Sequence, residues 1–475
     1  MSRRSDAALL IDFGSTYTKL RAVDLAAGAV VAAGQGPSTV TTDVTIGLEA
    51  ALADLDRHMG GLPEFRYRLA SSSAAGGLRM VTVGLVTELT AEAARRAALG
   101  AGARLVGSFS YRLTDGDVAA VVDLSPDVLL LSGGTDGGNS EVILHNARRL
   151  AESSLACPVI AAGNRNAADQ ISAVFSRAGK PLITAGNVMP AFQELDIEPA
   201  REAIRRVFID RIVHAKGIDR AAKMFDAVLM PTPAAVMTGA QLLAEGVAGR
   251  PGLGPLVVLD IGGATTDVHS IASGDPTGQG VVQHGLPEPF AKRTVEGDLG
   301  MRHNARTIVD TEGVDRIAAA AGVSSGAVER WLSRIEDDVK ILPRRAGDRA
   351  IDHAMACAAL RIAMRRHAGT IRIAHTAAGP VAVQEGKDLT AVKAVIGTGG
   401  ALVHAAAPAE VMAAALGDPS DATSLRPIAP VLYIDERYML YAAGLLAEVE
   451  PAAALAVAMN GIRSTGGAHE RSGTG

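Results

Sequence analysis

The sequence predicts an α/β protein with two similar halves and a smaller parallel unit inserted into the first half. Two stretches support this prediction, because each runs from a strand through a glycine turn into a second strand. They are I-D-F-G-S-T-Y-T-K, which ends at Lys19, and V-L-D-I-G-G-A-T-T-D-V, from Val258 to Val268. The third observation is the repeated order of strand, glycine and helix in residues 118–190, which is typical of parallel strands with right-handed crossovers. The 475 residues are enough for two to four domains.

Composition and charge exclude several classes of protein. The net charge of −5 gives no general attraction to nucleic acid or to an anionic membrane. Cys157 and Cys357 are the only cysteines and lie in apolar surroundings, which is typical of a reduced cytosolic protein. No apolar run approaches the roughly 20 residues of a membrane span, and the N-terminus lacks the apolar core of a signal peptide. We therefore expect a cytoplasmic protein without nucleic-acid or membrane partners.

The first half begins with a hairpin meander. Residues 7–13 form an apolar strand, Thr18–Asp24 alternates as a second strand, and a third follows the turn at Gly28. Antiparallel neighbours of this kind disfavour a dinucleotide-binding crossover at the N-terminus. Helices are predicted over Leu48–Met59 and Thr87–Ala101.

Residues 118–190 have a different rhythm. Strand-like runs precede Gly133, Gly163 and Gly186, and amphipathic stretches lie between them. We interpret this segment as a parallel βαβ insertion in the first half.

The second half starts after the boundary P-G-L-G-P at residues 251–255. Strand, turn and strand are followed by helices through 300–367, a β-rich patch over 370–397, and alanine-rich helices around 401–417 and 436–459. The predicted parts are a first half at 1–117, the insertion at 118–190, a helical return with a connecting helix at 191–254, the second half at 255–433, a C-terminal helix packing on the first half at 434–460, and a disordered tail at 461–475.

The two acidic-glycine stretches have the chemistry of a nucleotide site. Glycine lets backbone N–H groups approach a phosphate closely, and neighbouring hydroxyls satisfy its oxygens. An aspartate repels phosphate but can hold a hydrated Mg²⁺ beside it, and lysine adds positive charge. The first stretch supplies Asp12, Gly14, Ser15, Thr16 and Lys19; the second supplies Asp260, Gly262, Gly263, Thr265 and Thr266. Either stretch alone also fits an ordinary hairpin turn, but the pair favours a nucleotide clamp.

Together these stretches resemble the two phosphate motifs of the actin, heat-shock chaperone and sugar kinase ATPase superfamily. Ala264 departs from the second motif, in which a third glycine is usual. V-I-G-T-G-G-A resembles the adenosine motif of the superfamily, in which Gly397, Gly399 and Gly400 would leave bare backbone for base and ribose. The resemblance implies two actin-like, ribonuclease-H-like lobes around a cleft for ATP and Mg²⁺, with the metal held through water by Asp12 and Asp260.

The connecting helix departs from the superfamily at one position. P-T-P-A-A, from Pro231, resembles the chaperone motif that begins with glutamate, but Met230 stands where the glutamate would be. That glutamate helps to position the attacking water in the chaperones. The resemblance therefore implies ATP binding with slow hydrolysis.

Four further strings resemble one branch of the superfamily, the glutamate mutase accessory proteins, called GlmL or MutL. They are S-S-S-A-A-G-G-L-R-M at 71–80, S-G-G-T-D-G-G-N at 132–139, A-G-N-V at 185–188 and R-T-V-E-G-D-L-G-M-R at 293–302. The resemblance covers residues 7–460. It implies a partner that is an adenosylcobalamin-dependent mutase or aminomutase, and an ATP-driven reactivating role that exchanges damaged cobalamin.

Other functions fit the sequence less well. A small-molecule kinase of the same superfamily needs a catalytic aspartate near its substrate, and Asp298 is the one candidate outside the phosphate stretches. An electron-transferring ATPase needs closely spaced cysteines, which the chain lacks, and a mutase would carry the cobalamin-ligand pattern D-x-H-x-x-G, which is absent. For 132–139 a ligand site and a structural turn both stay open. The face of Arg361, Arg365 and Arg366 is either solvated or a docking surface for an acidic partner.

Overall fold

The computed structural model describes residues 5–14, 17–39, 43–72, 78–214, 226–377 and 379–466. The chain divides into two compact units. Unit 1 comprises Met1–Gly239, Gly285–Pro289 and Tyr441–Val457, and unit 2 comprises Ala240–His284, Phe290–Leu440 and Ala458–Gly475. No helix within the described ranges is both long and apolar enough to cross a membrane.

The first sheet of unit 1 has the strand order β10-β4-β1-β2-β3. Its strands are β1 (Ser5–Phe13), β2 (Tyr17–Asp24), β3 (Ala29–Pro37), β4 (Phe65–Ser72) and β10 (Ala227–Pro231). The first three are antiparallel neighbours, β4 runs parallel to β1, and β10 runs parallel to β4. This is the ribonuclease-H-like order that the resemblance to the ATPase superfamily implied, and it begins with the predicted meander. Helix α1 (Val44–Met59) buries Leu48 and Leu55 against Leu9, Ile11 and Phe13.

The main sheet of unit 2 repeats that order. Its strands are β13 (Leu256–Ile261), β14 (Thr266–Ile271), β16 (Ala291–Glu296), β19 (Ala394–Thr398), β20 (Val431–Ile434) and the short edge strand β21 (Arg463–Ser464). They lie in the order β16-β14-β13-β19-β20-β21, with an antiparallel hairpin β13–β14 and with β19 and β20 parallel to β13. Both units therefore have the same actin-like core, which confirms the predicted fold class.

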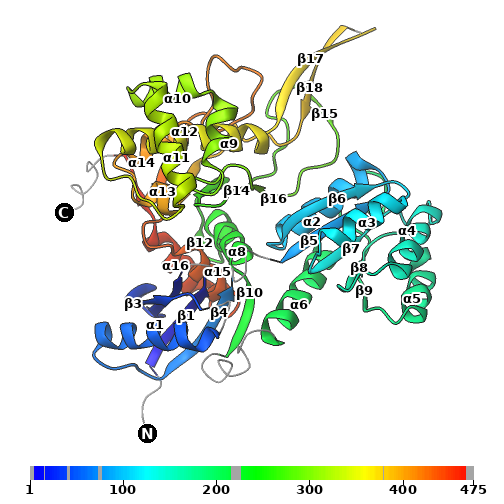
Figure 1. Cartoon of the computed structure of the whole chain (residues 1–475), viewed down its shortest axis with the longest axis horizontal. Helices are drawn as coiled ribbons and strands as arrows, with labels where there is room; N and C mark the ends of the chain where they lie inside the picture. The colour runs from blue at the N-terminus through cyan, green and yellow to red at the C-terminus, as the bar shows by residue number, and fades with distance from the viewer. Residues whose placement is uncertain are drawn as a thin grey trace. The chain divides into compact units, whose positions relative to one another are not determined.

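Unit 1 contains a second sheet, in which all five strands are parallel (Figure 1). Its strands are β5 (Arg79–Gly84), β6 (Arg104–Ser110), β7 (Val128–Leu131), β8 (Val159–Ala161) and β9 (Leu182–Thr184), in the order β6-β5-β7-β8-β9. The residues of β7 alternate between two cores, because Val128 and Leu130 face one cluster while Leu129 and Leu131 face the other. Helices α2 (Glu92–Gly100) and α6 (Glu198–His214) cover the first face, and α3 (Asp115–Asp123), α4 (Glu141–Glu152) and α5 (Ala168–Arg177) cover the second.

This parallel sheet is larger than the βαβ unit expected at 118–190. Residue 118 lies inside α3, and β5 and β6 come before it. The stretch predicted as one helix at Thr87–Ala101 begins as a π-helical turn, Thr87–Ala91, and continues as α2. A single-turn 3₁₀ helix, Arg165–Ala167, precedes α5.

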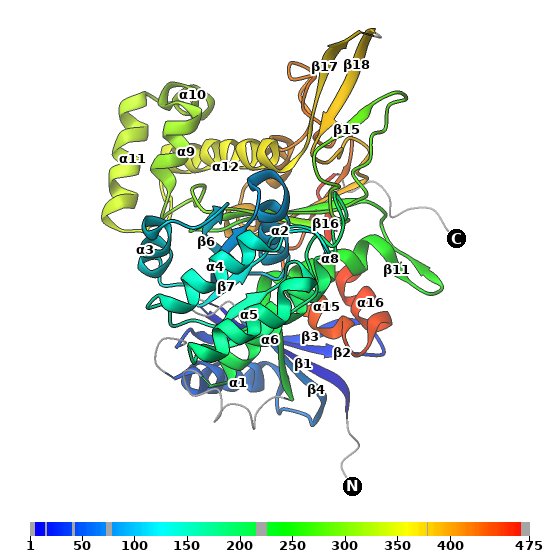
Figure 2. The same ribbon diagram turned by 90° about the vertical axis from the view of Figure 1, so that its right-hand side faces the viewer.

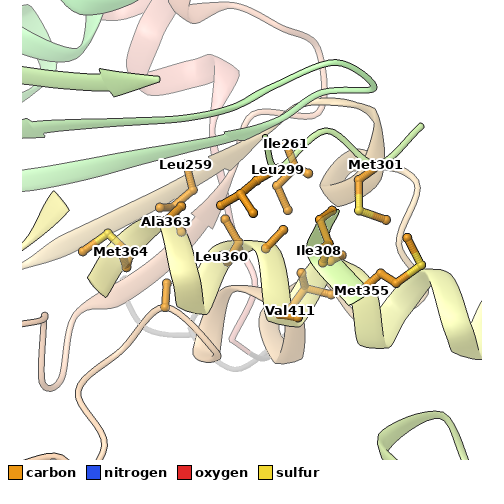
Figure 3. Packing of buried hydrophobic residues seen from close by; sticks show 14 of the residues in the cluster. Leu259, Ile261, Leu299, Met301, Ile308, Met355, Leu360, Ala363, Met364 and Val411 are labelled. Atoms are coloured by element: carbon orange, nitrogen blue, oxygen red, sulfur yellow. The ribbon is translucent and has the colours of Figure 1, made fainter. Parts of the chain in front are cut away.

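The helices of unit 2 pack on one face of its main sheet. They are α9 (Ala305–Glu312), α10 (Val314–Ala321), α11 (Ser325–Asp337), α12 (Ala346–His367), α13 (Gly400–Val403) and α14 (Pro408–Ala413). Figure 3 shows Leu360 and Met364 of α12 meeting Leu259 of β13 in this core. Trp331 of α11 is fully buried in the same cluster.

A small sheet of unit 2 carries the β-rich patch predicted at 370–397. It consists of β15 (Val282–His284), β17 (Thr370–Thr376) and β18 (Gly379–Glu385), and β17 and β18 form a long ribbon (Figure 2). The short hairpin β11 (Gly246–Val247) and β12 (Arg250–Pro251) lies at the predicted boundary.

The C-terminal helices are shorter than predicted, because proline divides them. The stretch around 401–417 separates into α13 and α14, which begins at Pro408, and 436–459 separates into α15 (Leu440–Ala447) and α16 (Pro451–Gly461). Gly444 of α15 lies directly against Ala235 of α8 (Thr232–Glu245), and Tyr67 donates a hydrogen bond to Glu450 at 3.1 Å. Part of the predicted tail, 467–475, lies outside the described residues.

Candidate functional site

Asp12 stands at the end of β1 with its side chain buried. The Thr232 hydroxyl, on the first residue of α8, donates a hydrogen bond of 2.6 Å to Asp12 Oδ1, and Ser71 Oγ lies 3.3 Å from the same oxygen. Lys19 is the direct partner of Asp12 in the antiparallel register, so both side chains leave the same face of the sheet. Burial raises the pKa of Asp12 above its ordinary value, while the Thr232 hydrogen bond and the charge of Lys19 act in the opposite direction.

The turn after Asp12 is held by its own backbone. Gly14 N–H donates to Tyr17 O at 3.1 Å, and Ser38 Oγ donates to Gly14 O at 2.6 Å. A Cβ at Gly14 would lie 2.6 Å from Tyr17 O, so the turn admits glycine alone without rearrangement. Ser15 and Thr16, the hydroxyls predicted to face phosphate, lie outside the described residues.

The second acidic-glycine stretch forms the turn between β13 and β14. Gly262 N–H donates to Thr265 O at 2.9 Å, and the backbone N–H groups of Met301 and Arg302 donate to Gly262 O and Gly263 O. Gly263 is exposed, whereas Thr266 is buried and its hydroxyl donates to Leu299 O at 2.7 Å. In the described contacts the Thr266 hydroxyl is therefore used by the fold, and it is a weaker candidate for phosphate than the sequence suggested.

The three glycines of the adenosine-like motif have different environments. Gly397 is buried against Met412 and Leu402, so its lack of a side chain serves core packing. Gly399 has φ +88° and lies directly against Asp260 Oδ1 and 2.5 Å from Ile261 O, measured from a built Cβ. Gly400 has open space where a Cβ would be. The motif thus leaves room for Asp260 at Gly399, where a side chain would collide with it, and presents bare backbone at Gly400.

A pocket of about 480 Å³ joins these two motifs within unit 2. Its lining includes Gly262 and Gly263 from the turn, Gly400 at the start of α13, and the apolar residues Ala401 and Val411. The lining combines these glycines and apolar side chains with charged ones, and such a mixture suits a ligand that carries a phosphate and a ring system.

One wall of the pocket is a hydrogen-bonded ion pair. Arg302 Nη2 lies 2.6 Å from Asp352 Oδ2, and Trp331 Nε1 donates to Asp352 Oδ1 at 2.7 Å. Burial raises the pKa of Asp352, although the charge of Arg302 opposes the shift. Arg302 belonged to one of the recognised strings, but nothing in the sequence linked it to Asp352, which lies fifty residues further on.

Asp298 is bound by a surface arginine. Arg366 Nη1 lies 2.8 Å from Asp298 Oδ1 and 2.7 Å from Glu296 Oε2, and the hydrogen bond from Arg366 lowers the pKa of Asp298. Asp298 is not among the described residues that line the pocket. Arg361 and Arg365 are likewise engaged, by Glu312 and Asp421. All three arginines of the face considered for docking therefore have acidic partners within unit 2.

The loop S-G-G-T-D-G-G-N follows β7 and is tied to two neighbouring loops. Asp136 Oδ1 accepts hydrogen bonds from Asn187 Nδ2 at 2.8 Å and from Arg165 N–H at 3.0 Å. Asn187 also belongs to the recognised string A-G-N-V, and its side chain is buried. These contacts give Asp136 and Asn187 a structural role at the carboxyl edge of the parallel sheet.

Two site residues were not singled out from the sequence. Thr232 contacts Asp12 directly, and a threonine between two prolines at a helix start was the signal that could have identified it. Ser71 lies opposite Asp12 in the parallel register of β4, which no local pattern reveals. Met230, in the place of the chaperone glutamate, is buried.

A cation beside Asp12 or beside Asp260 would be held mainly through water. Within the described ranges, no three His, Cys, Asp or Glu side chains are arranged to bind a metal ion directly. The water molecules around Mg²⁺ donate hydrogen bonds that a carboxylate accepts, and Asp12 and Asp260 are carboxylates near strand ends that could accept them.

A family model and a curated relative both match this chain over nearly its whole length. The family model described as "MutL protein" matches residues 8–462. Protein MutL of Clostridium tetanomorphum is 47% identical over 447 residues, which cover 94% of this chain and 97% of that protein.

Among solved structures, xylulose kinase from Bifidobacterium adolescentis aligns with a TM-score of 0.32 and 14% identity, covering 95% of this chain and 93% of that one. Gluconate kinase from Lactobacillus acidophilus gives 0.37 and 10%, covering 96% and 92%. At such low scores neither kinase bears on the activity of this chain. The family model and the curated relative, by contrast, each span nearly the whole sequence, and the chain belongs to the MutL protein family.

Proposed function

We propose that this chain is an ATP-binding accessory factor that reactivates an adenosylcobalamin-dependent mutase. The observation that supports nucleotide binding best is the pocket of unit 2, because it brings Gly263 of the acidic-glycine turn and Gly400 of the adenosine-like motif to one cavity. Membership of the MutL family and the resemblance of its strings to glutamate mutase accessory proteins support the partner.

The residues of the two acidic-glycine stretches have separate roles in this proposal. Backbone N–H groups around Gly14 and Gly263 bind phosphate oxygens, and Lys19 adds positive charge. Asp12 and Asp260 hold the water shell of Mg²⁺, which supplies charge neutralisation at the phosphates when it is bound. Gly400 leaves room for the nucleoside in the pocket.

Hydrolysis is expected to be slow. Met230 is apolar and buried at the position where the chaperones carry a water-positioning glutamate, so it cannot accept a proton or orient water. Thr232 orients Asp12 instead, through the hydrogen bond of 2.6 Å. The partner mutase would complete the site, or nucleotide exchange alone would drive the cycle.

A switching role needs surfaces that respond to the nucleotide. A ligand shifts a two-state equilibrium only by its differential affinity for the two states. We propose that the 118–190 segment, which contributes β7, β8 and β9 to the parallel sheet of unit 1, contacts the mutase. A kinase function receives less support, because Asp298 is paired with Arg366 and does not line the pocket.

The test is the recovery of activity by a mutase that has been inactivated during turnover. The chain is added with ATP, Mg²⁺ and fresh adenosylcobalamin, alongside the Asp260→Ala variant and a reaction without ATP. We expect recovery with the wild type alone. Equal recovery with and without the wild-type chain, across the adenosylcobalamin mutases of the same cell, would remove the reactivating function.

A further inference from the structure

Arg302 lines the pocket of unit 2, and the edge of its guanidinium group is occupied by protein acceptors. Nε donates to Ile341 O at 3.0 Å, Nη1 donates to Met301 O at 2.7 Å, and Nη2 donates to Asp352 Oδ2 at 2.6 Å. A further contact of 3.4 Å joins Nη1 to Asp352 Oδ1. Four of the five N–H groups of the guanidinium therefore point at the protein.

Asp352 is fixed in turn from its other side. Its Oδ1 accepts the indole N–H of Trp331, and its side chain is only 14% exposed, much like the 13% of Arg302. Trp331 is fully buried, and the Arg334 guanidinium lies 4.8 Å from the centre of its ring. The orientation of the Arg302 plane is thus set by a chain of contacts that reaches the core of unit 2.

The stem of Arg302 lies beside the phosphate end of the pocket. Its backbone N–H donates to Gly263 O at 2.9 Å, and its Cβ and Cγ lie 3.8 Å from a Cβ built on Gly263. The guanidinium lies further along, toward Asp352 and His353, which also line the pocket. The side chain of Arg302 therefore reaches from the turn at Gly263 to Asp352, and both of these residues line the pocket.

A guanidinium with its edge donors in use can offer a ligand only its flat faces. A flat, weakly hydrated cation attracts the face of an aromatic ring, whereas a phosphate needs free N–H groups in the plane. We propose that Arg302 contacts the nucleobase by stacking, and that Asp352 is the positioning residue that holds its plane. This inference rests on the proposed function, because it assumes that a nucleotide occupies the pocket of unit 2.

The chain carries its own reporter for this contact. Trp331 is the single tryptophan and is one hydrogen bond away from the carboxylate that binds Arg302. A ring stacked on Arg302 should change the environment of Asp352 and hence the emission of Trp331. Inorganic tripolyphosphate, which has no ring, should bind the same turn without this change.

The experiment compares Mg-ATP with Mg-tripolyphosphate by calorimetry on the full chain. Wild type, Arg302→Lys and Asp352→Asn are measured, with Arg306→Lys as the control. Arg306 is an exposed arginine of α9 that is paired with Glu329 and Glu336. The Arg302→Lys substitution keeps the positive charge but removes the planar guanidinium group.

We expect Arg302→Lys to weaken ATP binding about tenfold, the scale of one stacked base, and to leave tripolyphosphate binding within about twofold. Asp352→Asn should weaken ATP binding with the same selectivity, and Arg306→Lys should change neither. In the wild type, adenosine should change Trp331 emission in a saturable way, which tests the contact even where a variant folds poorly.

Three results would overturn the inference while leaving nucleotide binding intact. They are an equal loss of ATP and tripolyphosphate affinity in Arg302→Lys, no loss of either, and a wild type whose Trp331 emission is unchanged by adenosine at concentrations that compete with ATP. A wild-type chain that binds neither ATP nor tripolyphosphate would instead overturn the proposed function, and the inference with it.

Discussion

Replacing Gly399 and Gly400 separately by alanine should separate stability from nucleotide binding. At Gly399 the backbone has φ +88°, and an added Cβ would lie 2.5 Å from Ile261 O and overlap Asp260 Oδ1. A left-handed conformation costs a residue with a side chain about 1–2 kcal/mol, and the overlap with rigid backbone adds about 1–3 kcal/mol. At Gly400 the added methyl meets no atom within 4 Å, so the stability should change little.

The two variants should therefore differ by roughly 3 kcal/mol in stability, which corresponds to roughly 6–12 °C in the melting temperature of a unit of this size. The assay is thermal unfolding of each variant without ligand, followed by calorimetry with Mg-ATP. Gly399→Ala should melt lower and bind weakly, because Asp260 is displaced. Gly400→Ala should melt like the wild type and still lose about tenfold in affinity, since its methyl enters the pocket. Equal melting temperatures, or wild-type affinity in Gly400→Ala, would refute this reasoning.

Three further outcomes are expected. Burial lowers the pKa of His269 from 6.5 to about 3, so the unfolded chain binds the proton more tightly than the folded chain. Unit 2 should therefore lose a few kcal/mol of stability as the pH falls from 6.5 toward 3, and acid unfolding curves of His269→Gln should show a weaker dependence on pH. Thr232→Val removes a hydrogen bond that favours the ionised form of Asp12, so the pKa of Asp12 should rise further and the affinity for Mg-ATP should fall, most at low pH. Calorimetry at several pH values would contradict this if the loss of affinity did not depend on pH. Steady-state ATPase of the isolated chain should stay below about 1 s⁻¹ because Met230 cannot orient water, and a faster rate would mean that another group activates the water.

The turns and strands that depend on residues close together in the sequence could be predicted. Each acidic-glycine stretch was predicted as a hairpin turn, and Asp12 and Asp260 both stand at strand ends beside such turns. Local patterns suffice there, because the aspartate, the glycine and the following strand all lie within about ten residues of sequence. The same holds for the parallel strands that precede Gly133 and Gly163.

Contacts between distant residues were beyond a local pattern. The strands β5 and β6 are not predicted from the sequence, because β5 becomes part of the sheet only by pairing with the distant β7, and β6 only by pairing with β5. Gly397 belonged to the adenosine-like motif, yet its environment is the side chain of Met412. Asp352 meets Arg302 only when α12 packs on the sheet, so no spacing in the sequence predicts the ion pair of these two residues.

The most direct test of the account is the release of damaged cobalamin from an inactivated adenosylcobalamin mutase. The inactivated mutase is incubated with the chain and Mg-ATP, free and bound cobalamin are separated by size, and each fraction is measured by its absorbance. The account predicts that cobalamin leaves the mutase with wild type and Mg-ATP, and stays bound when ATP is omitted or when Asp260→Ala replaces the wild type. Release at the same rate in all three reactions would contradict the claim that nucleotide in this protein drives the exchange.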